Sequence, residues 1–425
     1  MIVPASAAQS SLAAGDLIFL MGQATAPDTI AFAPLKNISA GTVIFFSEAA
    51  RIGTASSGWS DWRLSATGAF TEGVFIYVAP ADIAAGTAVS LDVQALGDWG
   101  LALAGDNLFA FQGTPQAPEF LGALGWGSAA PFIATGTAVT ADTYLPMTLA
   151  SGVNAVAIAN TNDNARYNGV ASGTSAELLA AVSSAASWTS SNTALSSPGN
   201  LTVNDASDAT LATSQLGGYW FGHNAAGYTT APLTAPSHTT LSAFGVLQGQ
   251  GTLTLAPTGG GGSITQDFQI GTGSTSGLST SPTLDLANTP AVGFTLAIEA
   301  GYQLDLERLE FAYQRNANGP VQLALYVSND GFASSFQLGT DLSLVGANIG
   351  VANFSDAGVN AFTGTLEFRF YAWGAVNATT STFEIDEVYF KSSVMPVPEP
   401  GAGAILALGL GILALRRARL TPAAG

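Results

Sequence analysis

The chain has no cysteine among its 425 residues. Disulfide bonds, thiolate metal sites and cysteine nucleophiles are therefore excluded, but the compartment is not, because cysteine-free chains occur in oxidising and in reducing surroundings. Basic residues are scarce as well. The chain has 11 Lys and Arg but 29 Asp and Glu, so its formal net charge is −18. Nucleic-acid binding depends on basic patches that neutralise phosphates, so we expect none here.

Histidine is nearly absent too, with His223 and His238 the only two. Neither belongs to an H-E-x-x-H or H-x-H pattern, and the chain has no G-x-S-x-G motif, so we expect no transition-metal site and no cofactor. The sequence predicts a protein that is not an enzyme. A secreted hydrolase is the least favoured alternative, because a Ser-His-Asp triad is assembled by the fold and leaves no local pattern.

The N-terminus lacks the basic start of a secretory signal, since the first Lys or Arg is Lys36. Ala5-Ser6-Ala7 does match the small-x-small cleavage site of such signals. We therefore interpret residues 1–8 as the remnant of a signal peptide whose start was assigned too late. A plain N-terminal extension is the alternative.

Residues 9–245 contain short apolar runs separated by turn residues, among them "LIFLMG", "TVIFFSE" and "GVFIYVAP". Runs of this length and spacing indicate an all-β sandwich or barrel. One short helix is expected near 175–187, because Thr174 and Glu177 form a capping-box pattern ahead of helically spaced leucines. The sequence thus predicts an N-terminal β-rich domain over 9–245.

Residues 246–392 show the clearest strand pattern. In "TLEFRFYAW", Leu366, Phe368 and Phe370 share one phase, as in half-buried antiparallel strands. In "TFEIDEVYF" the alternation changes phase, which predicts a β-bulge near Asp386 and its neighbour Glu387. The run "PTGGGG" fits a flexible linker or a hairpin loop, and alternation on both sides favours the hairpin. We expect an all-β chain with two β-sandwich, jelly-roll-like domains.

Several segments carry a resemblance to known modules: "AGYQLDLERLEFAYQRNANGP", "LYVSNDGF", "GTLEFRFYAWGA" and "FEIDEVYF". They resemble jelly-roll modules of secreted bacterial proteins, distantly related in style to carbohydrate-binding β-sandwiches. The resemblance spans residues 263–391. It implies a secreted β-sandwich and names no activity.

Candidate ligand-binding residues are few. Tyr326, Tyr371 and Trp373 would stack on sugar rings if they lie on an exposed sheet face. Asp386 is a weak candidate for a structural Ca²⁺ site completed by backbone carbonyls. The alternative for its acidic surroundings is a charged strand edge that prevents further strand addition.

The C-terminus contains the apolar run "GAGAILALGLGILAL" at 401–415. Fifteen residues are short against the roughly 20 that an untilted membrane helix needs. Arg416, Arg417 and Arg419 follow at once, as in a stop-transfer segment whose basic end stays in the cytoplasm. We predict a single apolar helix over 401–415 that enters the inner membrane transiently.

The triplet Pro398-Glu399-Pro400 precedes this run. Triplet, apolar stretch, arginine cluster and nearby chain end together resemble the PEP-CTERM sorting signal of Gram-negative bacteria, here over residues 393–425. The resemblance implies processing by an exosortase-type membrane transpeptidase, then residence at the cell surface or in the extracellular matrix, often beside exopolysaccharide. A plain membrane anchor is the alternative. The sequence therefore predicts an exported, non-enzymatic surface or matrix protein, with a glycan-binding protein as the second hypothesis.

Overall fold

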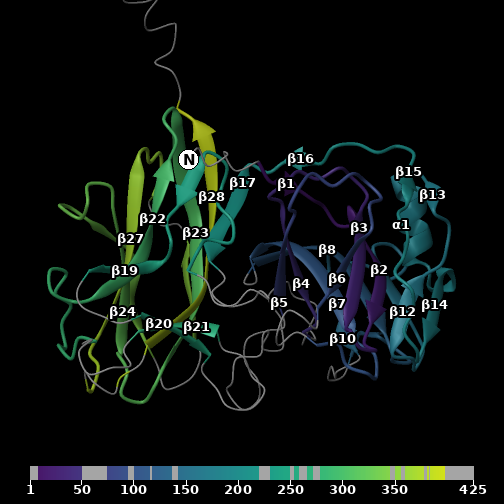
Figure 1. Ribbon diagram of the computed structural model, residues 1–425, viewed down its shortest axis with the longest axis horizontal. Helices are drawn as coiled ribbons and strands as arrows, with labels where there is room; N and C mark the ends of the chain where they lie inside the picture. Colours follow the sequence, from purple (N-terminus) through teal and green to yellow (C-terminus); the bar gives the residue numbers. More distant parts are fainter. Residues whose placement is uncertain are drawn as a thin grey trace, which may run out of the picture.

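The computed structural model describes residues 8–49, 74–93, 100–114, 117–135, 142–219, 230–248, 253–257, 266–270, 278–344, 350–355, 359–377, 381 and 383–397. Over these residues the chain folds into two β-sandwiches that lie side by side (Figure 1), so the all-β prediction with two sandwich domains is confirmed. Among the described residues no helix is long and apolar enough to span a membrane. The predicted helix over 401–415 lies outside them and stays a prediction.

The first sandwich consists of two five-stranded sheets. In order, the strands of one sheet are β11 (Ala155–Ile158), β8 (Ala117–Trp126), β7 (Asn107–Thr114), β4 (Val43–Ser47) and β5 (Val74–Val78). Those of the other are β14 (Trp188–Ser191), β12 (Asn164–Tyr167), β2 (Leu17–Gln23), β3 (Thr29–Pro34) and β6 (Val89–Asp92). Side chains from both inner faces, including Phe19, Phe32 and Phe46, pack into one core.

Short elements close the ends of this sandwich. Three two-stranded pairs are β1 (Ser10–Ser11) with β16 (Thr210–Leu211), β9 (Phe132–Ile133) with β10 (Thr143–Tyr144), and β13 (Ser172–Gly173) with β15 (Thr202–Val203). The helix α1 (Ser175–Ser183) is followed by the 3₁₀ turn η2 (Ala185–Ser187). The predicted capping box is present: the Glu177 amide donates to Thr174 Oγ1, and the Thr174 amide donates to Glu177 Oε2.

The second sandwich has two sheets of six strands within the described residues. One follows the order β20 (Leu253–Pro257), β21 (Gln266–Ile270), β28 (Phe383–Pro396), β23 (Tyr302–Arg315) and β26 (Gly350–Ser355), and β17 (Ser214–Tyr219) also pairs with β28. The other follows β18 (Thr239–Leu241), β22 (Ala291–Ile298), β27 (Thr365–Trp373), β24 (Gln322–Ser328) and β25 (Phe336–Ser343), and β19 (Gly245–Gln248) pairs with β22.

The expected domain boundary at 245/246 is too late in the chain. β17, β18 and β19 all precede residue 249, yet each pairs with a strand of the second sandwich. The second sandwich therefore begins at Ser214. The expected hairpin around the glycine run is confirmed, because β20 and β21 pair antiparallel from Leu253 opposite Ile270 to Pro257 opposite Gln266.

The predicted strand phase in β27 is also confirmed. Leu366, Phe368 and Phe370 are at most 2% exposed and lie in the core of the second sandwich. The β-bulge is present in β28: Glu310 of β23 pairs with Tyr389 and Ala312 with Asp386, so β28 has one extra residue between these pairs. The bulge explains how Phe383, Ile385, Val388 and Phe390 all reach the core despite the change of phase.

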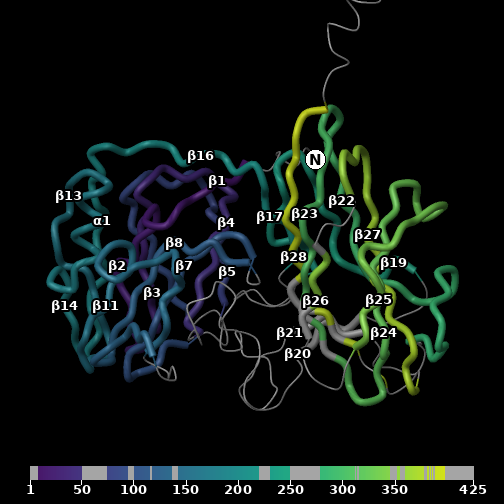
Figure 2. Tube along the Cα trace, turned by 180° about the vertical axis from the view of Figure 1, so that it is seen from behind, coloured from purple at the N-terminus to yellow at the C-terminus, as the bar shows by residue number. Residues whose placement is uncertain are grey.

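The two sandwiches contact each other through one sheet face each. Strand β4 reads Val-Ile-Phe-Phe, an uninterrupted apolar run that needs cover on both of its faces. Ile44 and Phe46 point into the first core, whereas Val43 and Phe45 point outward and pack with Leu216 and Tyr389 of the second sandwich. The rings of Phe45 and Tyr389 meet edge to face at 5.7 Å. Figure 2 shows β17 and β28 on the side of the second sandwich that faces the first.

Candidate functional site

Tyr371 and Trp373 of β27 were candidates for sugar stacking on the condition that they are exposed, and they do not meet this condition. Tyr371 is 0% exposed and Trp373 is 3% exposed. Both do lie on the face opposite Phe368 and Phe370, but further chain covers them. The reason is that alternation tells which residues share a face and does not tell what packs on that face. Tyr326 is the one of the three candidates that is partly exposed.

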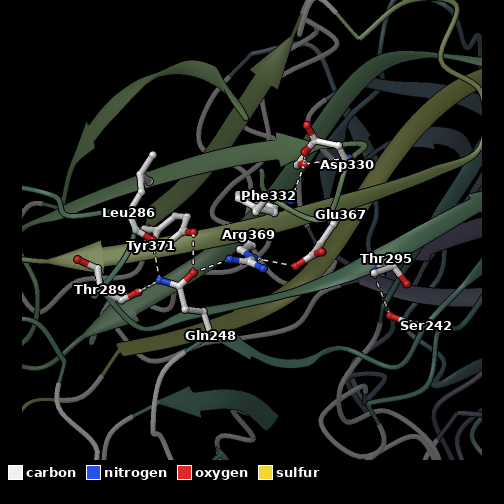
Figure 3. Close-up of polar contacts among 11 residues, drawn as sticks. Ser242, Gln248, Leu286, Thr289, Thr295, Asp330, Phe332, Glu367, Arg369 and Tyr371 are labelled. Carbon is white, nitrogen blue, oxygen red and sulfur yellow. Dashed lines mark hydrogen bonds and ion pairs between the residues drawn. The ribbon is translucent and has the colours of Figure 1, made fainter. Parts of the chain in front are cut away.

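Gln248 at the end of β19 contributes to the cover of Tyr371 (Figure 3). Its Nε2 donates to the carbonyl oxygens of Leu286 at 2.6 Å and Thr289 at 3.0 Å. Its Oε1 accepts from Arg369 Nη1 and from the Tyr371 hydroxyl, the latter at 3.4 Å. The Gln248 amide thus joins the 286–289 segment to β27. Trp373, Tyr371 and Arg369 follow one another along the outer face of β27, and Arg369 is the first of them whose side chain reaches the surface.

Arg369 sits in a tight polar setting, with its side chain 13% exposed. Its Nε donates to Glu367 Oε1 at 2.7 Å, which makes an ion pair two residues apart on the same strand face. Burial acts to lower the pKa of Arg369, but hydrogen bonding to Tyr371 and Glu367 outweighs it, so the pKa is raised. Burial raises the pKa of Tyr371 as well. The guanidinium therefore stays charged, and Glu367 largely compensates its charge.

The ring of Phe332 covers this guanidinium, with Arg369 Cζ 3.8 Å from the ring centroid. Phe332 has φ of +66°, a left-handed backbone that a bulky side chain rarely adopts. The turn is held by its neighbours: Ser328 Oγ accepts from the Phe332 amide at 2.9 Å and donates to Asp330 Oδ1 at 2.8 Å. A strained residue fixed in this way points to a role for its side chain.

Asp330 completes the turn. Its carboxylate accepts from the amide and the hydroxyl of Ser334, the hydroxyl at 2.6 Å. These hydrogen bonds, with that from Ser328, lower the pKa of Asp330 to about 2. The carboxylate therefore remains ionised under all ordinary conditions and keeps the turn in shape. "SNDGF" signals a turn in the sequence, but nothing local shows that the ring folds back over Arg369.

Tyr326 extends the same face. It pairs with Arg369 across the strands, and its ring meets that of Tyr371 edge to face at 5.8 Å. Its hydroxyl donates to Gln337 Oε1 at 3.2 Å, and Gln337 Nε2 donates to Asp341 Oδ1 at 2.7 Å. Burial, and then the charge of Asp341, raise the pKa of Tyr326. The face therefore combines two partly exposed rings with amide and carboxylate groups.

A second polar cluster lies at one end of the first sandwich. Asp28 precedes β3, Glu48 follows β4 and Asp106 precedes β7. Asp28 Oδ2 accepts from the Leu101 amide at 2.7 Å, and Asp106 accepts from the amides of Ala102 and Asn107. Burial raises the pKa of all three carboxyl groups, that of Asp106 to about 7. Repulsion between neighbouring negative charges raises these pKa values further. This cluster leaves no local pattern in the sequence because its members are far apart in the chain.

Metal and catalytic candidates remain sparse. No group of three or more His, Asp or Glu suited to a metal ion occurs among the residues that the structure describes. Asp386 lies at the bulge of β28, but its side chain is outside the described part, so the Ca²⁺ hypothesis is untested. His223 is also outside it. His238 stacks on Tyr302 at 3.7 Å, and its Nδ1 lies 2.8 Å from Glu299 Oε2.

No family model matches the sequence, and no curated protein matches it. A solved family 29 carbohydrate-binding module matches with 10% identity over 42% of this chain and 90% of its own, at a TM-score of 0.24. A mutant of CBM29-2 with mannohexaose matches with 12% identity over 42% and 93%, at 0.23. Likeness at this level identifies neither a family nor a ligand for this chain.

Proposed function

We propose that the protein binds glycans without acting on them, and that the face around Phe332 is the binding surface. The observation that carries the proposal is the Phe332 ring, partly exposed and fixed over Arg369 by a strained turn. An aromatic ring with one face toward a cation offers its remaining surface to the C–H face of a sugar. Tyr326 pairs with Arg369 across the strands, so its hydroxyl and the Gln337 amide that it contacts lie on the same face and can exchange hydrogen bonds with sugar hydroxyls.

A glycan array on the full-length chain tests this proposal, followed by titration of any glycan found. Phe332→Ala should weaken binding at least about tenfold, since losing one stacking ring corresponds to about 1.4 kcal/mol or more. Phe332→Trp should retain binding, because a larger ring can still stack. Tyr302→Ala removes a partly exposed ring from the other sheet and serves as the matched control. Unchanged affinity of Phe332→Ala would refute the assignment.

The place of action is proposed on separate grounds. We infer that the protein is exported and sorted through Pro398-Glu399-Pro400 by an exosortase-type transpeptidase, passing through the inner membrane to the cell surface or matrix. One observation supports this reading: β28 ends at Pro396, and the Val397 amide donates to the Gly301 carbonyl at 2.8 Å. Cleavage at the triplet would therefore leave every described strand in place. Binding to exopolysaccharide would suit a protein held there.

A further inference from the structure

A cleft of about 180 Å³ lies where the two sandwiches meet. Its walls include Ser10 and Ser11 of β1 and Gln112 of β7 from the first sandwich, with Ser214 of β17 and Lys391 of β28 from the second. Clefts between domains are frequent ligand sites. The volume of this cleft is well below the ~300–1,000 Å³ of pockets that bind drug-sized ligands. The volume suits one small ring inside the cleft.

The walls of the cleft are rigid. Gln112 Nε2 donates to the carbonyls of Ser10 at 2.9 Å and Val43 at 3.0 Å, while its Oε1 accepts from the Leu12 amide at 2.8 Å. Gln9 uses both ends of its amide on the backbone of Leu216 in the second sandwich. These amides fix the wall and the junction, so a ligand would find the site already formed.

The charges around the cleft are balanced. Lys391 Nζ lies 3.4 Å from Glu119 Oε1, which joins the two sandwiches. Glu307 Oε1 accepts from the hydroxyls of Ser393 and Ser214, and Arg308, which pairs with Lys391 across the strands, donates to Thr114 Oγ1. Two cations and two carboxylates thus lie around the cleft, and their formal charges sum to zero. A charged ligand would leave one of them uncompensated, whereas a neutral polar ligand would not.

Hydrogen-bonding capacity remains at the mouth of the cleft. Lys391 has three donors and Glu119, 58% exposed, several acceptor positions. Among the described residues no hydrogen bond involves the hydroxyls of Ser11 or Thr213, which also line the cleft. Val43 and Leu216 add apolar surface to the lining. Adjacent donor and acceptor groups beside apolar surface match the vicinal hydroxyls and C–H groups of a sugar ring.

We propose that this cleft is a second binding site and that it takes a single neutral pyranose, free or at the end of a glycan. It shares no residue with the face around Phe332, so either site can exist without the other. The site depends on the docking of the two sandwiches, because each supplies one member of the Lys391–Glu119 pair.

The chain offers an internal control for testing the cleft, since Lys36 and Lys391 are its only lysines. Their side chains are similarly exposed, at 36% and 30%, and each is paired with one carboxylate. We would acetylate the full-length chain with an amine-selective reagent and follow both lysines by mass spectrometry. The probes are glucose, galactose, mannose, xylose and N-acetylglucosamine, with glucuronate as a charged comparison.

At ten times its Kd a bound sugar occupies about 90% of sites, so acetylation of Lys391 should slow about tenfold while that of Lys36 is unchanged. Lys391→Gln should weaken binding of the same sugar at least about tenfold, and Lys36→Gln should leave it unchanged. Phe332→Ala should not alter the protection of Lys391. Absence of protection by every neutral sugar, stronger protection by glucuronate, or equal protection of Lys36 would overturn the proposal.

Discussion

The buried carboxylates of the first sandwich make stability depend on pH in a direction opposite to that of most acidic residues. Burial raises the pKa of Asp28, Glu48 and Asp106, and Asp92 adds repulsion at Asp28. The folded chain therefore keeps protons that the unfolded chain releases. Stability is greatest below the ordinary carboxylate pKa of about 4 and is lost as the pH rises toward the folded value of about 7 for Asp106.

The magnitude follows from Asp106, which is 4% exposed. A rise from 3.8 to about 7 corresponds to an upper limit of about 4 kcal/mol, because each pKa unit represents 1.36 kcal/mol. Urea unfolding of the full-length chain, followed by tryptophan fluorescence, should therefore show a clearly higher midpoint at pH 5 than at pH 8. We expect a difference of about 2–4 kcal/mol in the free energy of unfolding of the first sandwich.

Glu48→Gln isolates the cause. The neutral amide removes one of the three charges, so the loss of stability between pH 5 and pH 8 should shrink by at least about 1 kcal/mol. Asp208→Asn is the matched control in the same sandwich: it replaces an exposed carboxylate and keeps the Oδ1 that accepts from Asn37 at 2.8 Å. Equal midpoints at pH 5 and pH 8, or the same pH dependence in Glu48→Gln, would refute the reasoning.

Two further predictions concern the second sandwich and the tail. Phe368→Ala should lower the free energy of unfolding by about 3–5 kcal/mol in urea melts, because the ring is 1% exposed and stacks on Phe294 at 4.7 Å. Arg369→Ala, on the opposite face, should lower it by less than half of that amount. Equal losses in the two variants would contradict the strand phase. Glu399→Ala should leave export intact but block processing, so that full-length protein accumulates in the inner membrane. Native surface protein that retains residues 401–425 would contradict the sorting signal.

Local pattern was sufficient for much of the fold. Period-two alternation placed Leu366, Phe368 and Phe370 in one core, and the loss of phase in β28 located its bulge. The capping box at Thr174 and Glu177 marked the start of α1. Each of these features is decided by neighbours in sequence, which is why sequence reasoning could reach them.

Features decided by distant partners were not predictable. β17 contains two adjacent glycines and resembles a loop in sequence, yet it pairs with β28 some 170 residues later. Arg369 donates a hydrogen bond to Gln248, 121 residues away, and the sequence around either residue does not indicate this contact. Whether Tyr371 and Trp373 are exposed could not be read from alternation, because their cover comes from residues before β22. The buried carboxylates of the first sandwich and the cleft between the sandwiches are also assembled from residues far apart in the sequence, so they were not predictable either.

The position of β28 has a mechanical consequence. This strand lies inside its sheet, with β21 and β17 along one edge and β23 along the other. Tension applied at residue 397 would act along the strand, so its backbone hydrogen bonds would have to shear together. An edge strand, in contrast, can unzip one bond at a time. Because Tyr389 on the same strand packs against Phe45, the load would also reach the first sandwich. A protein tethered by its C-terminal side would thus be pulled at a strand that is hydrogen-bonded on both sides.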